Sequence, residues 1–584
     1  MDLDTYKYDE LPQGDFIRYL TLHAGQGTDP LECNLHTARS SETEFEAVSY
    51  VWGSDVRDQE IFCDGKVLAL TTNLSRVLRR ENLDEKGRQV AIMGQIYRHA
   101  SQVLIHMGGN DNGHGPQVVS LLDTVCGTIE RILPLLRKDW NTFPYPEASD
   151  AIFMDPRWDS LGVLLDETWF TRGWVVREAG LARDGQVYWG QSEFSWNSLM
   201  RTCNFLYKRA TKLLYAKSFD SKIPLAHVEL FEDRHQEYAK LFTSEMTWVH
   251  SSVLGYLSLT RQLSLKDPRD RIYAFIELVE DEQRQVHLKP NYEDHFLHVY
   301  QQFATEYIRT KKYIGLLSDV EHDAQSLESG IPSWVPRWDL PLTRTGYAFA
   351  PADSGYLALT SGDGSIYEPT VTEENTLSTR GVVFDTVIYA SKPLNMSTTT
   401  IDVITDIFKD MKKLATDSPY TRKNQLNVFI TALTAATREA EIVDWLRSQA
   451  AYYQAIREKH GDLGDLEAPN WLAKDGTIDL FHHTVKGYTH NRKLILTKRG
   501  YIGLAPAVAQ EGDLCGILFG CTTPCILRVS RTANSYKYLG AAYVVGRYHW
   551  QTTDGRVVFS EILGAKDSKE WMLWGIAEQD ITLC

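Results

Sequence analysis

The stretch FEAVSYVWG at residues 45–53 carries a short apolar run that ends in polar and aromatic residues. A second stretch, WFTRGWVVRE at residues 169–178, places another short apolar run before an arginine and a carboxylate. Apolar runs of this length, bounded by turn or polar residues, are typical of buried strands. We therefore expect strands at Ala47–Trp52 and at Trp174–Val176, and we expect both to belong to one N-terminal domain.

The sequence between these stretches alternates predicted strands and helices. Residues 61–70 predict a hairpin, because an Asp-Gly turn dipeptide lies at their centre. Asn73 is a candidate N-cap for a short helix, and a longer helix is expected from about Asp84. Residues 103–107 predict a strand, and residues 117–137 carry apolar side chains at helical spacing. This alternation predicts an α/β domain with helices packed on a mostly parallel sheet.

Changes in pattern along the chain predict five segments. Residues 1–40 form a leader strand and loop, and residues 41–195 form the α/β domain. Residues 196–345 are expected to be mainly helical, residues 346–490 to be mixed α/β, and residues 491–584 to form a β-rich C-terminal module. Glycines separate the apolar strands of this last segment.

Composition excludes several classes of protein. The 584 residues carry a formal net charge of −16, which argues against non-specific binding to nucleic acid or to anionic membranes. The N-terminus lacks the pattern of a signal or transit peptide, and no apolar run is long enough for a membrane span. The eight cysteines are scattered, as in reduced cytosolic proteins. We therefore expect a cytoplasmic protein without a membrane or nucleic-acid partner.

No metal site is predicted. Cys515, Cys521 and Cys525 form the sole cysteine cluster in the sequence, and they lie in or beside apolar strands. They lack the matching Cys or His pair that a tetrahedral zinc site needs. Packing as small core residues is the better interpretation.

The opening stretches resemble signatures of the fungal heterokaryon incompatibility (HET) domain. In residues 45–53 the similar features are an aromatic residue, a small residue, Ser-Tyr and Trp-Gly. Residues 85–103 resemble the central helix of the family, and residues 169–182 resemble its last motif. Weaker similarity to HET-domain proteins extends to residues 267–275, 332–336 and 499–503.

This resemblance carries expectations about fold and role. It implies a TIR-like N-terminal domain, a helical middle region and a β-rich C-terminal module. It also implies a role in fungal non-self recognition and programmed cell death signalling, through protein partners or self-association of the HET domain. Two departures stand out. A strand that the family usually has between the helices at Leu74 and Asp84 is missing, and Arg177 replaces the usual glutamine.

The resemblance to TIR domains also implies a possible enzyme, because some TIR domains cleave NAD. That reaction needs a carboxylate that stabilises an oxocarbenium-like ribose and orients its hydroxyls. Glu178 is the matching carboxylate here, and it is the predicted catalytic residue. Ser49, Tyr50, Trp52 and Trp174 are the predicted nucleotide-binding residues, since open α/β sheets bind ligands beyond the carboxyl ends of their strands. NAD would be a substrate, and no cofactor is expected.

Structural interpretations compete with each of these roles. Trp52 and Trp174 suit packing in a core or at its rim. Glu178 could form an ion pair with Arg172 or Arg177. The main hypothesis is therefore incompatibility signalling through the HET domain. The alternatives are an enzyme that cleaves NAD or processes another nucleotide, and an accessory protein of specialised metabolism or an inactive paralogue.

Overall fold

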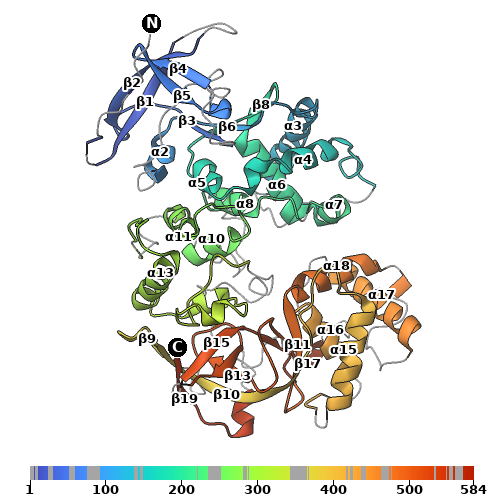
Figure 1. The fold of residues 1–584 in the computed structure, drawn as a ribbon. Coiled ribbons are helices and arrows are strands. Elements are labelled where there is room, and N and C mark those ends of the chain that lie inside the picture. Colours follow the sequence, from blue (N-terminus) through green and yellow to red (C-terminus); the bar gives the residue numbers. More distant parts are fainter. Residues whose placement is uncertain are drawn as a thin grey trace. The chain divides into compact units, whose positions relative to one another are not determined.

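The computed structural model describes most of the chain, and it divides into two compact units, Met1–Arg284 with Lys289–Asn291 and Gln285–Leu288 with Tyr292–Cys584 (Figure 1). No described helix is both long and apolar enough to cross a membrane. The described residues are 6, 11–12, 14–23, 30–51, 59–74, 93–136, 143–144, 146, 149–219, 221–234, 252–279, 286, 288–341, 365, 367–415, 418–420, 425–435, 442–461, 473–474, 476–531, 535–547, 549–551, 557–559 and 570–584.

The first unit begins with a four-stranded sheet that joins the leader strand to the predicted hairpin. Both residues of the hairpin turn have positive φ, 51° at Asp64 and 76° at Gly65, as a tight two-residue turn requires. The hairpin prediction is confirmed. The strands, in the order β1-β2-β4-β5, are β1 (Phe16–Leu22), β2 (Glu32–Arg39), β4 (Gln59–Cys63) and β5 (Lys66–Leu70).

A second four-stranded sheet, in the order β3-β6-β7-β8, forms the centre of this unit. Its first three strands are parallel and β8 is antiparallel, so the predicted α/β region is confirmed. The strands are β3 (Ala47–Tyr50), β6 (Val103–Gly108), β7 (Gly185–Trp189) and β8 (Ser192–Ser195). The helices are α2 (Met93–His99), α3 (Gly115–Ile132), η1 (Leu133–Leu136), α4 (Arg157–Leu165), η3 (Thr168–Thr171), α5 (Trp174–Gly180), α6 (Trp196–Arg209), α7 (Thr211–Ala216) and α8 (Leu225–Arg234).

Neighbouring residues of β3 face opposite sides of this sheet. Because side chains alternate along a strand, Ser49 and Tyr50 point in opposite directions. Ser49 is in register with buried residues on the other three strands, and helices α3, α5 and α6 pack against this sheet. Tyr50 is in register with His106 and Tyr188, whose rings stack with centroids 5.0 Å apart. The residues in register with Ser49 are Ile105, Val187 and Phe194.

The strand predicted at Trp174–Val176 is wrong, because these residues begin helix α5. Residues 175–179 are all buried, so this short helix is covered on all sides. A three-residue apolar run fits a buried strand and a buried helix turn equally well, so periodicity could not separate the two.

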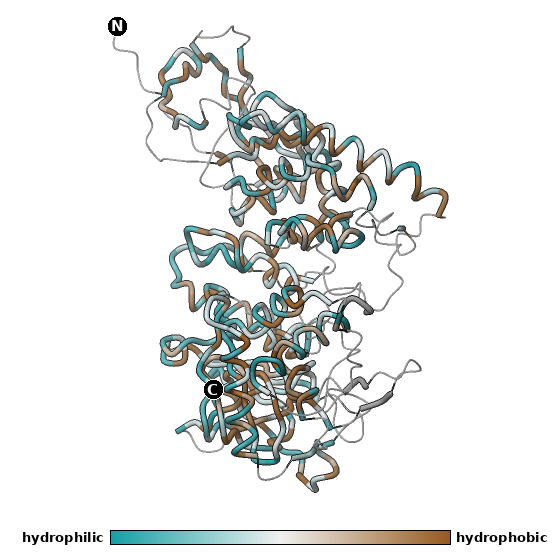
Figure 2. Tube along the Cα trace, turned by 90° about the vertical axis from the view of Figure 1, so that its right-hand side faces the viewer, coloured by the Kyte–Doolittle hydropathy of each residue, from teal (hydrophilic) through white to brown (hydrophobic). Residues whose placement is uncertain are grey.

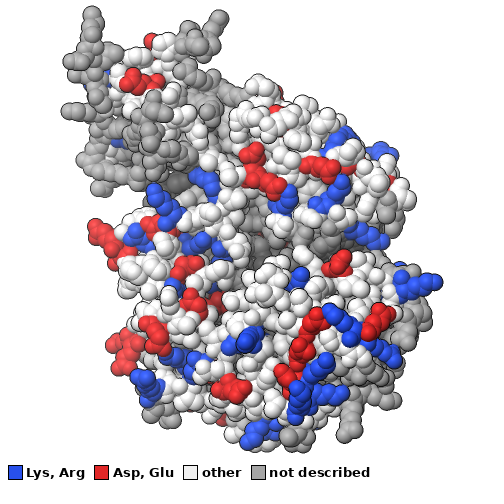
Figure 3. All heavy atoms as spheres, turned by 45° about the vertical axis from the view of Figure 1, so that its right-hand side comes forward, with Lys and Arg blue, Asp and Glu red and all other residues white. Residues whose placement is uncertain are grey.

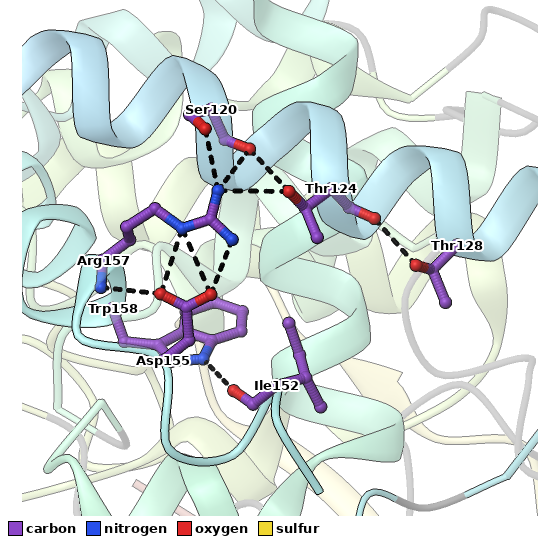
Figure 4. A network of polar contacts seen from close by, with 7 residues as sticks. All are labelled: Ser120, Thr124, Thr128, Ile152, Asp155, Arg157 and Trp158. Atoms are coloured by element: carbon purple, nitrogen blue, oxygen red, sulfur yellow. Dashed lines mark hydrogen bonds and ion pairs between the residues drawn. The ribbon is translucent and has the colours of Figure 1, made fainter.

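Arg157, the first residue of α4, links this helix to α3 by hydrogen bonds (Figure 4). The Arg157 Nη1 atom donates to the carbonyl and hydroxyl oxygens of Ser120, at 2.9 and 2.8 Å, and to Thr124 Oγ1 at 3.1 Å. Its Nε and Nη2 atoms donate to the carboxylate of Asp155. These bonds fix the two helices against each other.

The middle of the chain is helical, as predicted. Within the first unit, the residues after α8 include α10, α11 and η5, and the second unit begins with α13, η6 and η7. The elements are α10 (Val253–Leu259), α11 (Asp270–Tyr273), η5 (Ile276–Leu278), α13 (Phe296–Lys311), η6 (Gly315–Asp319) and η7 (Ser326–Glu328).

The second unit contains a closed ring of strands, and the predicted β-rich C-terminal module is confirmed. Strand β10 pairs with both β13 and β19, and the order β13-β14-β15-β19 completes the ring. A register shift between Val383 and Asp385 bends β10, whose far end joins β11 and so leads into β12 and β16. The ring strands are β10 (Leu377–Ala390), β13 (Leu514–Leu518), β14 (Cys525–Val529), β15 (Ser535–Ala541) and β19 (Gln579–Leu583).

The other elements of this unit surround the ring and its extension. Helices α16 and α18 pack on β12 and β11. Hydrophobic and hydrophilic residues alternate along the described trace (Figure 2). The surrounding elements are β9 (Thr370–Val371), α15 (Ile401–Leu414), α16 (Gln425–Leu433), α17 (Ile442–His460), α18 (Ile478–Thr489), β11 (Arg492–Thr497), β12 (Ile502–Pro506), β16 (Tyr543–Val544), β17 (His549–Gln551), β18 (Val557–Phe559) and η9 (Glu570–Trp574).

Candidate functional site

Glu178 lies on α5 and its carboxyl group is buried against β3. The Ser49 hydroxyl donates a hydrogen bond of 2.5 Å to Glu178 Oε2. The same hydroxyl oxygen accepts the indole N–H of Trp169, at 2.9 Å from Nε1. The structure therefore brings two predicted site residues, Ser49 and Glu178, into direct contact, and it adds Trp169 to them. We call these three residues the Glu178 triplet.

Opposing effects set the charge of Glu178. Burial raises the pKa of its carboxyl group above its ordinary value, and the Arg172 guanidinium, the Ser49 hydroxyl and the Arg177 guanidinium offset only part of that rise by favouring the ionised form. The side chain is only 5% exposed, so a substrate can reach it only after local opening. The arrangement is a buried carboxylate that is held by a hydroxyl and has two guanidinium groups near it.

Tyr50 contributes its backbone carbonyl to the surroundings of Glu178, and its phenol lies near enough for the Glu178 charge to raise its pKa. Its carbonyl oxygen accepts a hydrogen bond from Arg172 Nη1, and the Val48 carbonyl accepts one of 3.2 Å from the hydroxyl of Tyr97 on α2. Residues 48 and 50 share one edge of β3, since backbone groups alternate along a strand. Among the described strands β3 is at the edge of its sheet, so these two side chains bind carbonyls where a further strand would otherwise pair.

The remaining predicted residues lie elsewhere. Trp174 is half-buried at the start of α5, and its indole N–H donates to Asp270 Oδ2 at 3.1 Å. Arg177 stacks over the Trp174 ring, with its guanidinium carbon 5.8 Å from the ring centroid. Trp174 thus joins α5 to α11 and is not part of the Glu178 triplet. The prediction for Trp52, and the expected gap in the strand order before Asp84, fall outside the described residues.

Arg177 pairs with a different carboxylate from the one that the sequence suggested. Its Nη2 forms an ion pair with Glu277 on η5, and Nη1 donates to the Tyr273 carbonyl at 3.4 Å. Arg98 on α2 donates to the Glu277 backbone carbonyl at 2.6 Å. The weakly similar segment around Asp267–Phe275 is therefore joined to α2 and α5, which carry the stronger motifs.

Sequence reasoning missed Trp169, Tyr97 and His227 as neighbours of the site. The His227 ring stacks on Trp169 with centroids 5.4 Å apart, and burial lowers its pKa to about 3. Within the described part of the chain, neither ring nitrogen of His227 has a hydrogen-bond partner. Each of these residues fits an apolar helical or core pattern, so no local signal separates it from ordinary packing.

The described residues contain no group of three or more His, Cys, Asp or Glu side chains placed to hold a metal ion. Cys515, Cys521 and Cys525 are free thiols buried around the ring of strands, and burial raises their pKa values. On the face drawn in Figure 3, basic and acidic side chains of the described residues are interspersed. That distribution does not itself indicate a polyanionic ligand.

Two family models match this chain. Residues 78–178 match the model described as heterokaryon incompatibility protein (HET), and residues 427–557 match the Het-6 beta-barrel domain. The first match ends at Glu178, whereas the stretch at residues 45–53 lies outside it. The second match contains α17, α18 and most of the strands after them.

A curated relative spans nearly the whole chain. It is heterokaryon incompatibility protein 6, OR allele, of Neurospora crassa, which is 23% identical over 662 aligned positions that cover 93% of this chain and 95% of that protein. No solved structure matches this chain. The two family matches and this relative support a fungal protein of the heterokaryon incompatibility type.

Proposed function

We propose that this protein acts in fungal non-self recognition and signals programmed cell death through its first unit. That unit would bind protein partners or a second copy of the chain in the cytoplasm. The observation that carries this proposal is that one chain combines both matched regions and aligns over nearly its whole length with an incompatibility protein.

A heterokaryon assay tests this proposal with the full chain. The chain is expressed in a fungal strain that lacks it, and that strain is fused with a panel of tester strains. We expect fusion with some testers to give cell death, measured as dye uptake in fused cells, and normal growth with others. Equal survival with every tester, at a confirmed protein level, would contradict the proposal.

A pair of valine variants asks whether the first unit carries the signal. Val187 is fully buried in β7, whereas Val163 on α4 is 37% exposed. Val187→Asp places a charge in the core of the sheet and should abolish cell death, because a buried unpaired charge disrupts packing. Val163→Asp makes the same chemical change at the surface and should leave cell death unchanged.

Glu178 supports a second candidate, an enzyme that cleaves NAD or processes another nucleotide. The carboxylate is held near the carboxyl end of β3, where parallel sheets bind nucleotides. In this proposal its charge stabilises the oxocarbenium-like ribose as neutral nicotinamide leaves, and water completes the hydrolysis.

Release of nicotinamide from NAD by the purified full chain tests this second candidate. Glu178→Gln keeps the shape of the side chain and removes its charge, so it should reduce release at least about a hundredfold. Glu193→Gln on β8 changes an exposed glutamate and should have no effect. No release by the parent protein, or full release by Glu178→Gln, would rule out this candidate.

A further inference from the structure

The hydrogen bonds of the Glu178 triplet run from Trp169 through Ser49 to Glu178. An indole N–H can only donate, so the bond from Trp169 to Ser49 occupies one lone pair of the hydroxyl oxygen. A serine hydroxyl has one hydrogen, and the acceptor that it meets is Glu178 Oε2, 2.5 Å away. That separation lies in the range of hydrogen bonds between a hydroxyl and an ionised carboxylate.

We propose that Trp169 is a positioning residue that fixes the Ser49 hydroxyl as a donor to Glu178 and thereby holds Glu178 in its ionised form. Trp169 donates to the Ser49 hydroxyl, so it acts on the carboxylate through Ser49. This inference deepens the second candidate function, the cleavage of NAD, which needs a charged Glu178. Only the catalytic purpose of that charge rests on the proposed function. The charge of Glu178 can be measured whether or not the protein cleaves NAD.

Trp169 is held in place firmly enough for this role. It is fully buried, and its ring contacts those of Phe170, Trp196 and His227, with centroids 5.2, 5.5 and 5.4 Å away. Aromatic contacts on several sides restrict rotation of the indole and so fix the direction of its N–H. Active sites orient a reacting group with buried donors whose direction is fixed before any ligand binds.

Other charged and titratable groups also influence Glu178. Arg172 and Arg177 favour its ionised form, while Tyr50 on β3 and Tyr97 on α2 lie close enough to affect and be affected by its charge. His227 on α8 touches Trp169 from the other side. The experiment therefore compares variants that leave all five of these side chains unchanged.

The protonation of Glu178 is measured directly in the full chain by infrared spectroscopy. The spectrum of Glu178→Gln is subtracted from that of the parent at a series of pH values, so that the carboxylic acid band of Glu178 is isolated. Trp169→Phe keeps an aromatic ring and removes the N–H. It should raise the titration midpoint of Glu178 by about one pH unit, a tenfold change in the protonation equilibrium.

A second comparison separates positioning from packing. Ser49→Ala should raise the midpoint by at least as much, and adding Trp169→Phe to Ser49→Ala should cause no further change, because Trp169 acts through the hydroxyl. Trp158→Phe removes a buried indole N–H elsewhere in the first unit, where it donates to the Ile152 carbonyl, and should leave the midpoint where it is. Replacement of Trp169 by benzothienylalanine, which keeps the bicyclic shape and lacks the N–H, should reproduce the effect of Trp169→Phe without disturbing folding.

Two results would overturn the proposal. An unchanged midpoint in the benzothienylalanine variant would show that the indole N–H does not matter. A further shift when Trp169→Phe is added to Ser49→Ala would show that Trp169 acts by packing. If the midpoints move as expected and the parent releases no nicotinamide, the positioning role stands and only the NAD-cleaving candidate fails.

Discussion

The sheet that contains β3 and the ring that contains β10 differ at their edges. The described part of the first sheet is open, and its edge strand β3 has carbonyls bound by the side chains of Tyr97 and Arg172. The ring has no open edge, because β10 pairs with strands on both sides. At an open edge the unpaired backbone groups can be bound by polar side chains, whereas in a closed ring the neighbouring strands bind them. The candidate site lies in the first unit, beside this edge strand.

The largest effect is expected from a substitution that prevents the ring from closing. A Cβ at Gly381, which pairs with both β13 and β19, would lie 2.2 Å from the Ile517 carbonyl oxygen. Gly381→Val should lower the free energy of unfolding of the second unit by about 3 kcal/mol or more. Hydrogen exchange of peptides from each unit, measured in increasing denaturant, reports which unit weakens.

A glycine in a helix provides the control for this substitution. A Cβ at Gly127 on α3 would meet no atom within 4 Å. Gly127→Ala should therefore leave stability unchanged or raise it by up to about 1 kcal/mol. If Gly381→Val were tolerated as well as Gly127→Ala, the ring would not be closed in the way described.

Loss of the Ser49 hydroxyl should weaken the first unit alone. Ser49→Ala leaves the buried Glu178 carboxylate without its short hydrogen bond and should cost between about 2 and 3 kcal/mol. The same exchange experiment should show faster exchange in β3 and α5 and no change in the ring strands. Equal weakening of both units would mean that they do not unfold independently.

Acid should affect the two units differently through their buried histidines. Burial lowers the pKa of His227 from 6.5 to about 3, so the unfolded chain binds a proton below pH 6.5 that the folded chain does not. Stability is therefore unaffected above pH 6.5 and falls as pH decreases, by about 2 kcal/mol at pH 5. Thermal unfolding at several pH values measures this loss, and His227→Phe should remove it.

His322 in the second unit provides a second buried histidine whose acid response can be compared with that of His227. It is buried too, and burial lowers its pKa, but the Ser333 carbonyl that pairs with its Nε2 raises that pKa and offsets part of the shift. We expect His322→Phe to change the acid response less than His227→Phe. It should also weaken the fold at neutral pH, because it removes bonds to Ser326 and Ser333. A larger change in acid response for His322→Phe would contradict this explanation.

The smallest effect concerns the edge of β3 itself. Tyr97→Phe removes the hydroxyl that binds the Val48 carbonyl and should cost about 1 kcal/mol. Tyr452→Phe removes a buried hydroxyl that has no hydrogen-bond partner within the described residues, so it should be neutral or stabilising. Denaturant unfolding of both variants gives the comparison, and equal losses would show that the edge bond contributes nothing.

Local patterns predicted the elements that local forces determine. The turn at Asp64 and Gly65, the strand at residues 103–107 and the amphipathic α3 needed only neighbouring residues to be recognised. The run at Trp174 was assigned wrongly, because its three apolar residues lack a decisive period. The ring was beyond prediction, since it depends on β10 pairing with strands more than a hundred residues away.

The candidate site was predictable in part. The resemblance identified Glu178 and Ser49, which do meet, although 129 positions separate them in sequence. It also proposed Tyr50, whose phenol and Glu178 affect each other's charge, and Trp174, whose indole N–H donates to Asp270 at the start of α5. Trp169 was not proposed, since a buried tryptophan in a sequence is indistinguishable from a core residue until its N–H is seen to reach Ser49.

The pairing of β10 with β19 also constrains how the chain folds while it is being made. Leu377 pairs with Leu583, so the ring cannot close until the ribosome has released Gln579–Leu583. The sheet of the first unit is complete once β8 has emerged, far earlier in synthesis. Domains generally fold as units from the N-terminus, and contacts between distant residues form slowly. The edges of β10 and β15 that pair with β19 are therefore exposed during translation, when chaperones have the most opportunity to bind this chain.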